Sequence, residues 1–281
     1  MRLLPALLFV FAFVPGCRAQ APSSNEISSN FIIPNPAPSA PMAQWVPASG
    51  RATVSLDLDG ATLRGFRYSG ADPKAPTLLF FNGNGMTIFR ADPLYRQLAA
   101  LGPTVVVYDY RGYGFSTGTP DLMTYRRDSL QLYDTVAASA PGHRVVVYGF
   151  SMGTAMASYI ASERMIAALI LAAPIGSAAE EYPIYGKLIG YSAEFIAAHK
   201  PSQESVALFG EAALIAKSRA PLLVLHGTDD FLIPVEQARE VLEASPSTVK
   251  RMVIIPDANH NATAEDPDSF AAVSQFLHSL N

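Results

Sequence analysis

The apolar residues of this chain occur in short runs separated by longer segments of mixed polarity. Six runs have the aliphatic and β-branched composition that is typical of strands buried on both faces of a parallel sheet. They cover residues 77–81, 104–109, 144–148, 168–172, 222–225 and 249–255. Helical patterns fall between them. This alternation predicts an α/β fold with a mostly parallel, doubly wound sheet.

Two earlier segments have a different pattern. Residues 52–58 and 61–68 alternate apolar and polar side chains on either side of Asp59 and Gly60. An Asp-Gly pair between two alternating segments is a strong hairpin signal. The sequence therefore predicts an N-terminal antiparallel hairpin of two edge strands.

Two helices have recognisable first residues, because Asp92 precedes Pro93 and Asp266 precedes Pro267. An aspartate side chain can accept hydrogen bonds from the first amides of a helix, and proline is well tolerated at the first helical position. We therefore expect Asp92 and Asp266 to cap helices. The first of these helices should end near Gly102.

The composition favours one globular domain, which we place at residues 51–281. Hydrophobic residues make up 49% of the 281-residue chain and charged residues 16%, which argues against disorder. The net charge of −4 gives no electrostatic reason to expect a nucleic-acid partner. The segment GYGFSTG at 112–118 lacks the spacing of a dinucleotide-binding loop, so nucleotide binding is not expected.

The N-terminus has the features of a secretory signal, which we assign to residues 1–17. Arg2 precedes an apolar stretch that is too short to span a bilayer as a mature helix. Cys17 is the only cysteine and follows Pro15 and Gly16, which resembles a lipobox in which the thiol is acylated. Ordinary cleavage after Ala19 is the alternative. Both readings predict export, as a membrane-anchored lipoprotein or as a periplasmic or secreted protein.

Residues 18–50 are rich in proline, serine and alanine, as in the segment PNPAPSAP at 34–41. Such a segment cannot propagate a helix or a strand ladder, and it behaves as a semi-extended linker. We expect a tether that would hold the domain away from a membrane to which Cys17 is anchored.

The first candidate catalytic residue is Ser151, in the pentapeptide GFSMG at 149–153. The pentapeptide directly follows the apolar run at 144–148, so it predicts a serine on a sharp turn between a strand and a helix. Glycines on both sides suit this turn, because larger side chains would collide with the neighbouring strand and helix. A serine in this position is typical of a nucleophile.

A serine nucleophile needs a histidine to take its proton and a carboxylate to orient that histidine. His260 follows the last apolar run and should lie at the carboxyl edge of the sheet, where the turn at Ser151 also emerges. The acid candidates are Asp229 and Asp230, after the run at 222–225. We select Asp230 and expect Asp229 to satisfy the backbone of the turn.

The oxyanion of the reaction needs two backbone donors. One expected donor is the amide of Met152, directly after the nucleophile. The other is the amide of Asn84, in the glycine-rich segment NGNG at 82–85 after the first parallel strand. The alternative interpretation of this segment is a plain glycine-rich turn.

Five motifs together resemble the α/β-hydrolase superfamily, and their spacing resembles its Bem46-like, serine aminopeptidase S33-like branch. The resemblance covers residues 52–281 and implies Ser151 as nucleophile, Asp230 as acid, His260 as base, and the amides of Asn84 and Met152 as oxyanion donors. One departure is Asn82, where relatives usually carry histidine. The motifs are FNGNG at 81–85, YDYRGYGFS at 108–116, GFSMG at 149–153, HGTDDFLIP at 226–234 and ANHN at 258–261.

The resemblance also implies an α/β-hydrolase fold with a short helical cap over the site, at about residues 175–219. The aromatic residues there either pack the cap onto the core or form an apolar acyl-binding pocket. They are Tyr182, Tyr185, Tyr191 and Phe195.

The expected function is cleavage of an ester, thioester or amide of a small-molecule acyl substrate through an acyl-enzyme on Ser151, with no cofactor and no metal. A catalytically inert scaffold of the same fold, tethered at the membrane, is the alternative. An acyltransferase would use the same residues. Neither a protein partner nor an oligomeric state can be read from the sequence.

Overall fold

The computed structural model describes residues 26–27, 40–140, 142 and 144–280. The predicted signal at 1–17, the lipobox cysteine Cys17 and most of the predicted tether lie outside the described residues. No helix within the described ranges is long and apolar enough to cross a membrane.

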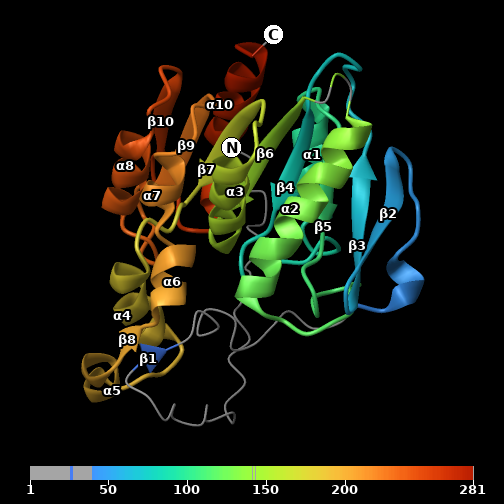
Figure 1. Cartoon of the computed structure of the whole chain (residues 1–281). Helices are drawn as coiled ribbons and strands as arrows, with labels where there is room; N and C mark the ends of the chain where they lie inside the picture. Colours follow the sequence, from blue (N-terminus) through green and yellow to red (C-terminus); the bar gives the residue numbers. More distant parts are fainter. Residues whose placement is uncertain (1–25, 28–39, 141, 143, 281) are drawn as a thin grey trace.

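A mixed sheet of eight strands forms the centre of the molecule, in the order β10-β9-β7-β6-β4-β5-β3-β2 (Figure 1). β2 and β3 pair antiparallel, as do β3 and β5, and the other neighbours are parallel. The predicted parallel strands and the hairpin are therefore present. The strands are β2 (Arg51–Leu58), β3 (Ala61–Tyr68), β4 (Thr77–Phe81), β5 (Val105–Tyr108), β6 (Val145–Phe150), β7 (Ala168–Ala172), β9 (Leu222–Gly227) and β10 (Lys250–Ile255).

One detail of the hairpin prediction was wrong, because β2 is an edge strand but β3 is not. β3 lies between β2 and β5, and it pairs with β5 from Gly65 opposite Tyr108 to Tyr68 opposite Val105. Its residues Leu63 and Phe66 are almost completely buried. The hairpin therefore extends the parallel sheet through β3 and leaves only β2 at the edge.

Helices cover both faces of the sheet, as expected for a doubly wound fold. Figure 1 shows α2 and α3 side by side in front of the strands. At Gly149 on β6 an added Cβ would lie 2.6 Å from the carbonyl oxygen of Gly153, so this face adjoins α3. The preceding side chain, Tyr148, points to the other face, where its ring centroid lies 4.7 Å from that of Phe80. Phe80 in turn contacts Tyr95 of α1.

Both helices whose first residues were predicted from the sequence are present outside the cap. Asp266 caps the last helix as expected and accepts a hydrogen bond from the amide of Asp268. The prediction for Asp92 was wrong, because Ala91 is the N-cap and Asp92 lies inside the helix. The helices are α1 (Asp92–Ala100), α2 (Leu122–Ser139), α3 (Met152–Glu163), α8 (Val235–Ala244), α9 (Ala262–Glu265) and α10 (Pro267–His278).

Two arginines, one on β2 and one on α1 itself, explain the position of Asp92. Its Oδ1 accepts hydrogen bonds from Arg51 Nη1 at 2.5 Å and from the Tyr68 hydroxyl at 2.9 Å, and its Oδ2 accepts one from Arg96 Nε at 2.6 Å. Two guanidinium groups attract a carboxylate more strongly than neutral backbone amides do. Asp92 therefore joins α1 to β2 and β3 and caps no helix.

The region between β7 and β9 contains the helices of the predicted cap, which lie beyond the carboxyl edge of the sheet (Figure 1). A two-residue strand, β8, pairs there in parallel with β1, which comes from the N-terminal segment. The last helix of this region, α7, packs between α3 and α8 and belongs to the helical layer of the sheet. The elements are α4 (Ala178–Leu188), α5 (Ala193–Ala198), β8 (Lys200–Pro201), α6 (Gln203–Leu208), α7 (Glu211–Ile215) and β1 (Glu26–Ile27).

The described end of the N-terminal segment, from residue 40 onward, contacts the domain. The amide of Ala40 donates a hydrogen bond to the carbonyl of Gly114 at 2.8 Å. The indole Nε1 of Trp45 donates to the carbonyl of Gly65 at 3.1 Å, beside a single 3₁₀ turn (Met42–Gln44).

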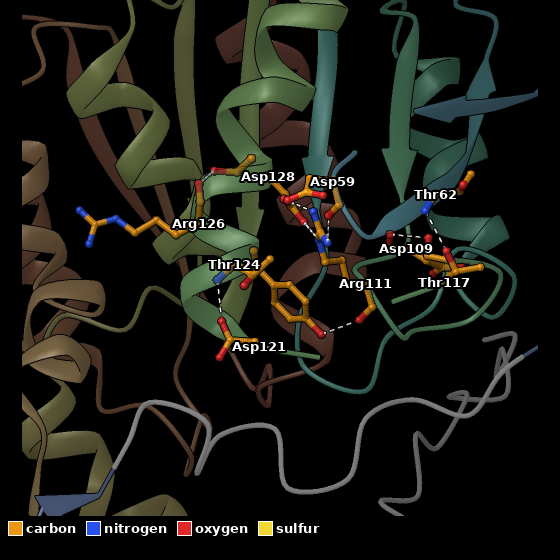
Figure 2. Close-up of polar contacts among 12 residues, drawn as sticks. Asp59, Thr62, Asp109, Arg111, Thr117, Asp121, Thr124, Arg126 and Asp128 are labelled. Carbon is orange, nitrogen blue, oxygen red and sulfur yellow. Dashed lines mark hydrogen bonds and ion pairs between the residues drawn. The ribbon is translucent and has the colours of Figure 1, made fainter. Parts of the chain in front are cut away.

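The loop after β5 is joined to α2 and to the hairpin by a buried ion pair (Figure 2). The guanidinium of Arg111 binds both carboxylate oxygens of Asp128, and its Nη1 also donates to the carbonyl of Asp59 at 2.5 Å. The Tyr125 hydroxyl donates to the carbonyl of Arg111 at 2.8 Å. Both charged side chains are more than nine-tenths buried.

Candidate active site

Ser151 lies on the turn between β6 and α3 and has φ 51° and ψ −123°. A residue other than glycine rarely has a positive φ, so this backbone is strained. An added Cβ at Gly153 would lie 2.2 Å from the carbonyl oxygen of Phe81, and one at Gly149 would also collide with backbone. Both glycines of the pentapeptide are therefore required by close packing, as the sequence suggests.

The structure brings the three predicted catalytic side chains together. The Oγ of Ser151 lies 2.9 Å from Nε2 of His260, and Nδ1 of His260 lies 2.8 Å from Oδ2 of Asp230. His260 comes from the loop after β10 and Asp230 from the loop after β9. These loops and the turn at Ser151 meet at the carboxyl edge of the sheet, because the three strands run parallel.

Asp230 is held by the backbone as well as by the imidazole. Its Oδ1 accepts hydrogen bonds from the amides of Leu232 at 2.9 Å and Ile233 at 3.0 Å, and its side chain is fully buried. Burial alone would raise the pKa of Asp230, but the hydrogen bond with His260 holds this pKa below its usual range. The carboxylate is therefore ionised at neutral pH and can stabilise an imidazolium.

Asp229 has a different environment from its neighbour. Its Oδ1 accepts a hydrogen bond from the Thr228 hydroxyl at 3.0 Å. The turn amides that the sequence analysis expected it to bind are bound by Asp230.

A second histidine lies beneath the site. His226 on β9 is fully buried, and its Nε2 lies 3.8 Å from Oδ2 of Asp230, which is beyond a hydrogen bond. Its Nδ1 lies 3.0 Å from the carbonyl of Gly227. Burial lowers the pKa of His226, so this imidazole is neutral near pH 7.

The predicted oxyanion loop follows β4 and is anchored by Asn82, which replaces the usual histidine. The Oδ1 of Asn82 accepts a hydrogen bond from the Tyr95 hydroxyl at 2.6 Å, and its carbonyl accepts one from the Tyr110 hydroxyl at 2.8 Å. An added Cβ at Gly83 would lie 3.3 Å from Cβ of Ser151. The loop therefore lies directly against the nucleophile.

The two predicted oxyanion donors flank this contact. Met152 is the first residue of α3, and the first amides of a helix have no intrahelical acceptor. The side chain of Asn84 accepts a hydrogen bond from the Tyr113 hydroxyl at 2.8 Å and donates one to the Tyr185 hydroxyl at 2.8 Å. The roles of the Asn84 and Met152 amides in holding an oxyanion stay predictions.

A cavity of about 40 Å³ opens beside Ser151. The catalytic candidates, the oxyanion loop and the cap all contribute to its wall, and the cap supplies Glu181 and Tyr185. The residues around the cavity are Gly83, Asn84, Phe150, Ser151, Met152, Ile175, Glu181, Tyr185, Leu232, Ile233, His260 and Asn261.

Most of the cap aromatics pack against one another. The rings of Tyr191 and Phe195 lie 4.7 Å apart, and Tyr182 contacts Tyr191 at 6.5 Å. Of the four aromatic residues, Tyr185 contributes to the wall of the cavity beside Ser151, and Tyr182 contributes to the wall of a second cavity within the cap. The packing interpretation therefore describes Tyr191 and Phe195.

Two buried glutamates near the site were not predicted. Glu181 on α4 lines the cavity, and burial raises its pKa to about 8. Glu211 on α7 lies within hydrogen-bond distance of the hydroxyls of Thr154 and Ser158 on α3, and it accepts a hydrogen bond from the amide of Ile175. Burial raises the pKa of Glu211 to about 8 as well.

Within the described ranges, no three histidine, cysteine, aspartate or glutamate side chains are grouped so that they could hold a metal ion.

The sequence model of the serine aminopeptidase S33 family matches residues 72–207 and 211–267 of this chain. The uncharacterised protein Rv2307c of Mycobacterium tuberculosis is 32% identical over 227 residues, which cover 79% of this chain and 76% of that protein. Lysophosphatidylserine lipase ABHD12 of Rattus norvegicus is 32% identical over 187 residues. That match covers 61% of this chain and 46% of the rat protein, so less than half of ABHD12 is represented.

Solved structures have the same fold. The Pyrococcus furiosus esterase Pf2001 superimposes with a TM-score of 0.68 at 20% identity, covering 87% of this chain and 97% of the esterase. The Paleococcus ferrophilus monoacylglycerol lipase superimposes with a TM-score of 0.61 at 19% identity, covering 77% of this chain and 99% of the lipase. These likenesses establish the α/β-hydrolase fold predicted from the sequence.

Proposed function

Because the chain belongs to the serine aminopeptidase S33 family of α/β-hydrolases, we propose that it is a serine hydrolase that cleaves an ester, thioester or amide through an acyl-enzyme on Ser151. The observation that carries this proposal is the continuous hydrogen-bonded series from Ser151 through His260 to Asp230. Each pair of atoms is already within the distance that proton transfer requires.

In this mechanism Nε2 of His260 takes the proton of the Ser151 hydroxyl while Oγ attacks the carbonyl carbon of the substrate. Asp230 stabilises the imidazolium that forms. His260 then gives the proton to the leaving alcohol, thiol or amine, and the acyl group remains on Ser151. Water, activated by the same imidazole, attacks the acyl-enzyme and releases the acid.

The negative charge on the carbonyl oxygen would be stabilised by the amides of Met152 and Asn84. The close contact of Gly83 with Ser151 supports this assignment, because it brings the loop that contains Asn84 against the nucleophile. Donors of this kind, fixed before the reaction begins, contribute a large part of the rate enhancement in acyl transfer.

The decisive test is Ser151→Ala. We expect kcat to fall by at least about a thousandfold and labelling by a fluorophosphonate probe to disappear, because both need the Oγ nucleophile. Ser162→Ala is the matched control, because Ser162 lies on the same helix and its hydroxyl binds the carbonyl of Tyr159. Unchanged turnover in Ser151→Ala would refute the proposal, and a wild-type protein that the probe does not label would indicate an inert scaffold.

We infer that esters are the principal substrates. The similar proteins whose names state an activity include an esterase, a monoacylglycerol lipase and a lysophosphatidylserine lipase. A panel of p-nitrophenyl acyl esters and aminoacyl amides, each assayed beside Ser151→Ala, would test this inference. Faster cleavage of the amides than of the esters would contradict it.

We also propose that the protein is exported and anchored through an acylated Cys17. This proposal rests on the apolar stretch after Arg2 and on the lipobox-like position of the only cysteine. Metabolic labelling with a clickable fatty acid should mark the wild-type protein and fail to mark Cys17→Ser. Equal labelling of the two proteins, or labelling of neither, would contradict the anchor.

A further inference from the structure

Glu211 on α7 is a fully buried carboxyl group that the proposed mechanism does not use. Its Oε1 lies 2.6 Å from Oγ1 of Thr154 and accepts a hydrogen bond from the amide of Ile175 at 3.2 Å. Its Oε2 lies 3.1 Å from Oγ of Ser158. Both carboxyl oxygens are therefore held in place, where α7 meets α3 and the loop after β7.

Thr154 connects this carboxyl group to the nucleophile. The residue lies in the first turn of α3 and is fully buried. Its Oγ1 lies 2.5 Å from the carbonyl oxygen of Ser151, which also accepts a hydrogen bond from the amide of Thr154 at 2.8 Å. Two groups of Thr154 therefore contact the Ser151 carbonyl, and one of these groups contacts Glu211.

The direction of the Ser151 carbonyl determines the direction of the next amide. The carbonyl oxygen of Ser151 and the N–H of Met152 belong to one planar peptide group, so fixing one of them fixes the other. The N–H of Met152 is a predicted oxyanion donor. Ser151 has φ 51° and ψ −123°, and a strained backbone of this kind persists only where its surroundings hold it.

We propose that Glu211 and Thr154 are positioning residues for the oxyanion donor: they hold the carbonyl of Ser151, and the rigid peptide group transmits this restraint to the N–H of Met152. The inference rests on the serine hydrolase function and the oxyanion donors proposed above. Neither Glu211 nor Thr154 lines the cavity beside Ser151, so both act through the backbone.

The protonation state of Glu211 makes this restraint depend on pH. A neutral carboxyl group can donate to Thr154, whose own hydrogen then remains for the Ser151 carbonyl, whereas an ionised one would take that hydrogen. Burial raises the pKa of Glu211 to about 8, against the opposing effect of its hydrogen bonds. No charged side chain of α3, α8 or another described element contributes to this shift. The restraint should therefore be present at pH 7 and be lost as pH rises above about 8.

Thr154→Val tests the restraint, because it removes the hydroxyl and keeps the amide that binds Ser151. The kcat and KM of one p-nitrophenyl ester are measured at pH 7, with kcat expressed per serine that a fluorophosphonate labels, so that unfolded protein is not counted. We expect kcat to fall about tenfold while KM changes by less than about twofold, because an oxyanion donor acts mainly on the transition state.

Two further variants accompany this substitution. Thr154→Ser keeps the hydroxyl and should retain most of the wild-type kcat. Thr135→Val is the matched control, because the Thr135 hydroxyl binds the carbonyl of Gln131 one turn earlier on α2. Its kcat and KM should equal those of the wild type.

A trifluoromethyl ketone with the same acyl chain separates positioning from a loss of stability. Oγ of Ser151 adds to its carbonyl carbon, the proton passes to His260, and the carbonyl oxygen becomes an oxyanion like that of the reaction. In Thr154→Val the inhibition constant of this ketone should rise by about the factor by which kcat/KM falls.

The pH profile tests Glu211 separately. Between pH 7 and pH 9.5 the kcat of the wild type should fall about tenfold as Glu211 ionises. Glu211→Gln cannot ionise, and its amide can donate to Thr154 with loss of only the longer bond from Ile175, so its kcat should stay within about twofold over this range. Glu204→Gln, an exposed control on α6, should keep the fall of the wild type.

Three results would overturn the inference. One is a kcat per labelled serine in Thr154→Val that equals the wild-type value. Another is a lower kcat in Thr154→Val with an unchanged inhibition constant for the ketone, which would indicate a structural role. The third is the same fall in kcat above pH 8 in Glu211→Gln and the wild type, and this comparison decides the question if Thr154→Val does not fold. A wild type that is neither labelled nor active on any ester would instead refute the proposed function.

Discussion

The Thr154 hydroxyl has one hydrogen but contacts two oxygen atoms that ordinarily only accept. Its Oγ1 lies 2.5 Å from the carbonyl oxygen of Ser151 and 2.6 Å from Oε1 of Glu211. The Thr154 hydroxyl can donate to only one of these oxygens. Both contacts can therefore be hydrogen bonds only if the other oxygen carries a hydrogen and donates it to Thr154. A neutral Glu211 supplies that proton, donates to Thr154 and lets Thr154 donate to Ser151. The raised pKa of Glu211 agrees with this arrangement.

A neutral buried Glu211 makes stability depend on pH. Its pKa rises from 4.5 to about 8 on folding. Between these values the folded protein holds a proton that the unfolded chain has lost, so the free energy of unfolding should fall as pH rises from about 5 to 8. Glu211→Gln does not titrate and should remove roughly a few kcal/mol of this fall. Denaturant unfolding at pH 5, 6.5 and 8 measures the difference.

The control for this experiment is Glu204→Gln, on the exposed side of α6. It should preserve the pH dependence of the wild type. If Glu211→Gln and the wild type lost the same stability between pH 5 and pH 8, Glu211 would be ionised in the folded protein and the proton assignment would be wrong.

Some residues of the candidate site could be predicted from the sequence and others could not. Ser151, Asp230 and His260 each follow an apolar run, and the ends of parallel strands meet at one edge, so their meeting could be predicted from order alone. Glu181 could not. It follows another glutamate near the start of a helix, where acidic side chains are usually solvated. Its burial depends on how the cap folds back over the site.

At the scale of elements, two aspartates of α2 form ion pairs with arginines of other elements, in opposite environments. Asp128 binds Arg111, and both side chains are more than nine-tenths buried. Asp134 binds Arg164 at 2.9 Å, and side-chain exposures there are 52% and 36%. The same chemistry on one helix thus provides an internal comparison of buried and exposed ion pairs.

Asp128→Asn should lower the free energy of unfolding by about 3–5 kcal/mol, because it leaves the Arg111 charge buried without its counter-ion. Asp134→Asn, the matched control, should change it by less than about 1 kcal/mol, because water screens the exposed pair. Chemical denaturation followed by circular dichroism measures both. Equal effects of the two substitutions would contradict the assigned role of the buried pair.

The strands were predictable from local patterns, whereas two details required knowledge of tertiary contacts. β3 was expected at an edge of the sheet, because a hairpin signal does not show whether either of its two strands pairs with a third strand. Asp92 was expected to cap α1, because the local sequence does not show that Arg51 on β2 and Tyr68 on β3 bind it. Local propensity yields to such contacts when they are stronger.

At the scale of the whole molecule, the cap and the predicted oxyanion loop both contribute to the wall of the cavity beside Ser151. A hydrogen bond connects them, from Nδ2 of Asn84 to the hydroxyl of Tyr185 on α4. Movement of the cap away from the loop would break this bond, so the bond should oppose the movement.

Tyr185→Phe removes the bond and keeps the ring. Amide hydrogen exchange in α4 should become about fivefold faster, because the closed cap loses roughly 1 kcal/mol of stabilisation. Tyr191→Phe is the control, since the ring of Tyr191 packs on Phe195 within the cap. Identical exchange in α4 of Tyr185→Phe and the wild type would show that this bond does not restrain the cap.

The pairing of β1 with β8 ties the N-terminal segment to the cap by backbone hydrogen bonds. Only eight residues lie between Cys17 and Glu26 along the chain, a reach of about 30 Å when fully extended. With the proposed fatty acid on Cys17, the cap would stay close to the leaflet that carries the anchor. Hydrolysis would then be interfacial, with amphiphiles arriving by lateral diffusion and not from the surrounding water.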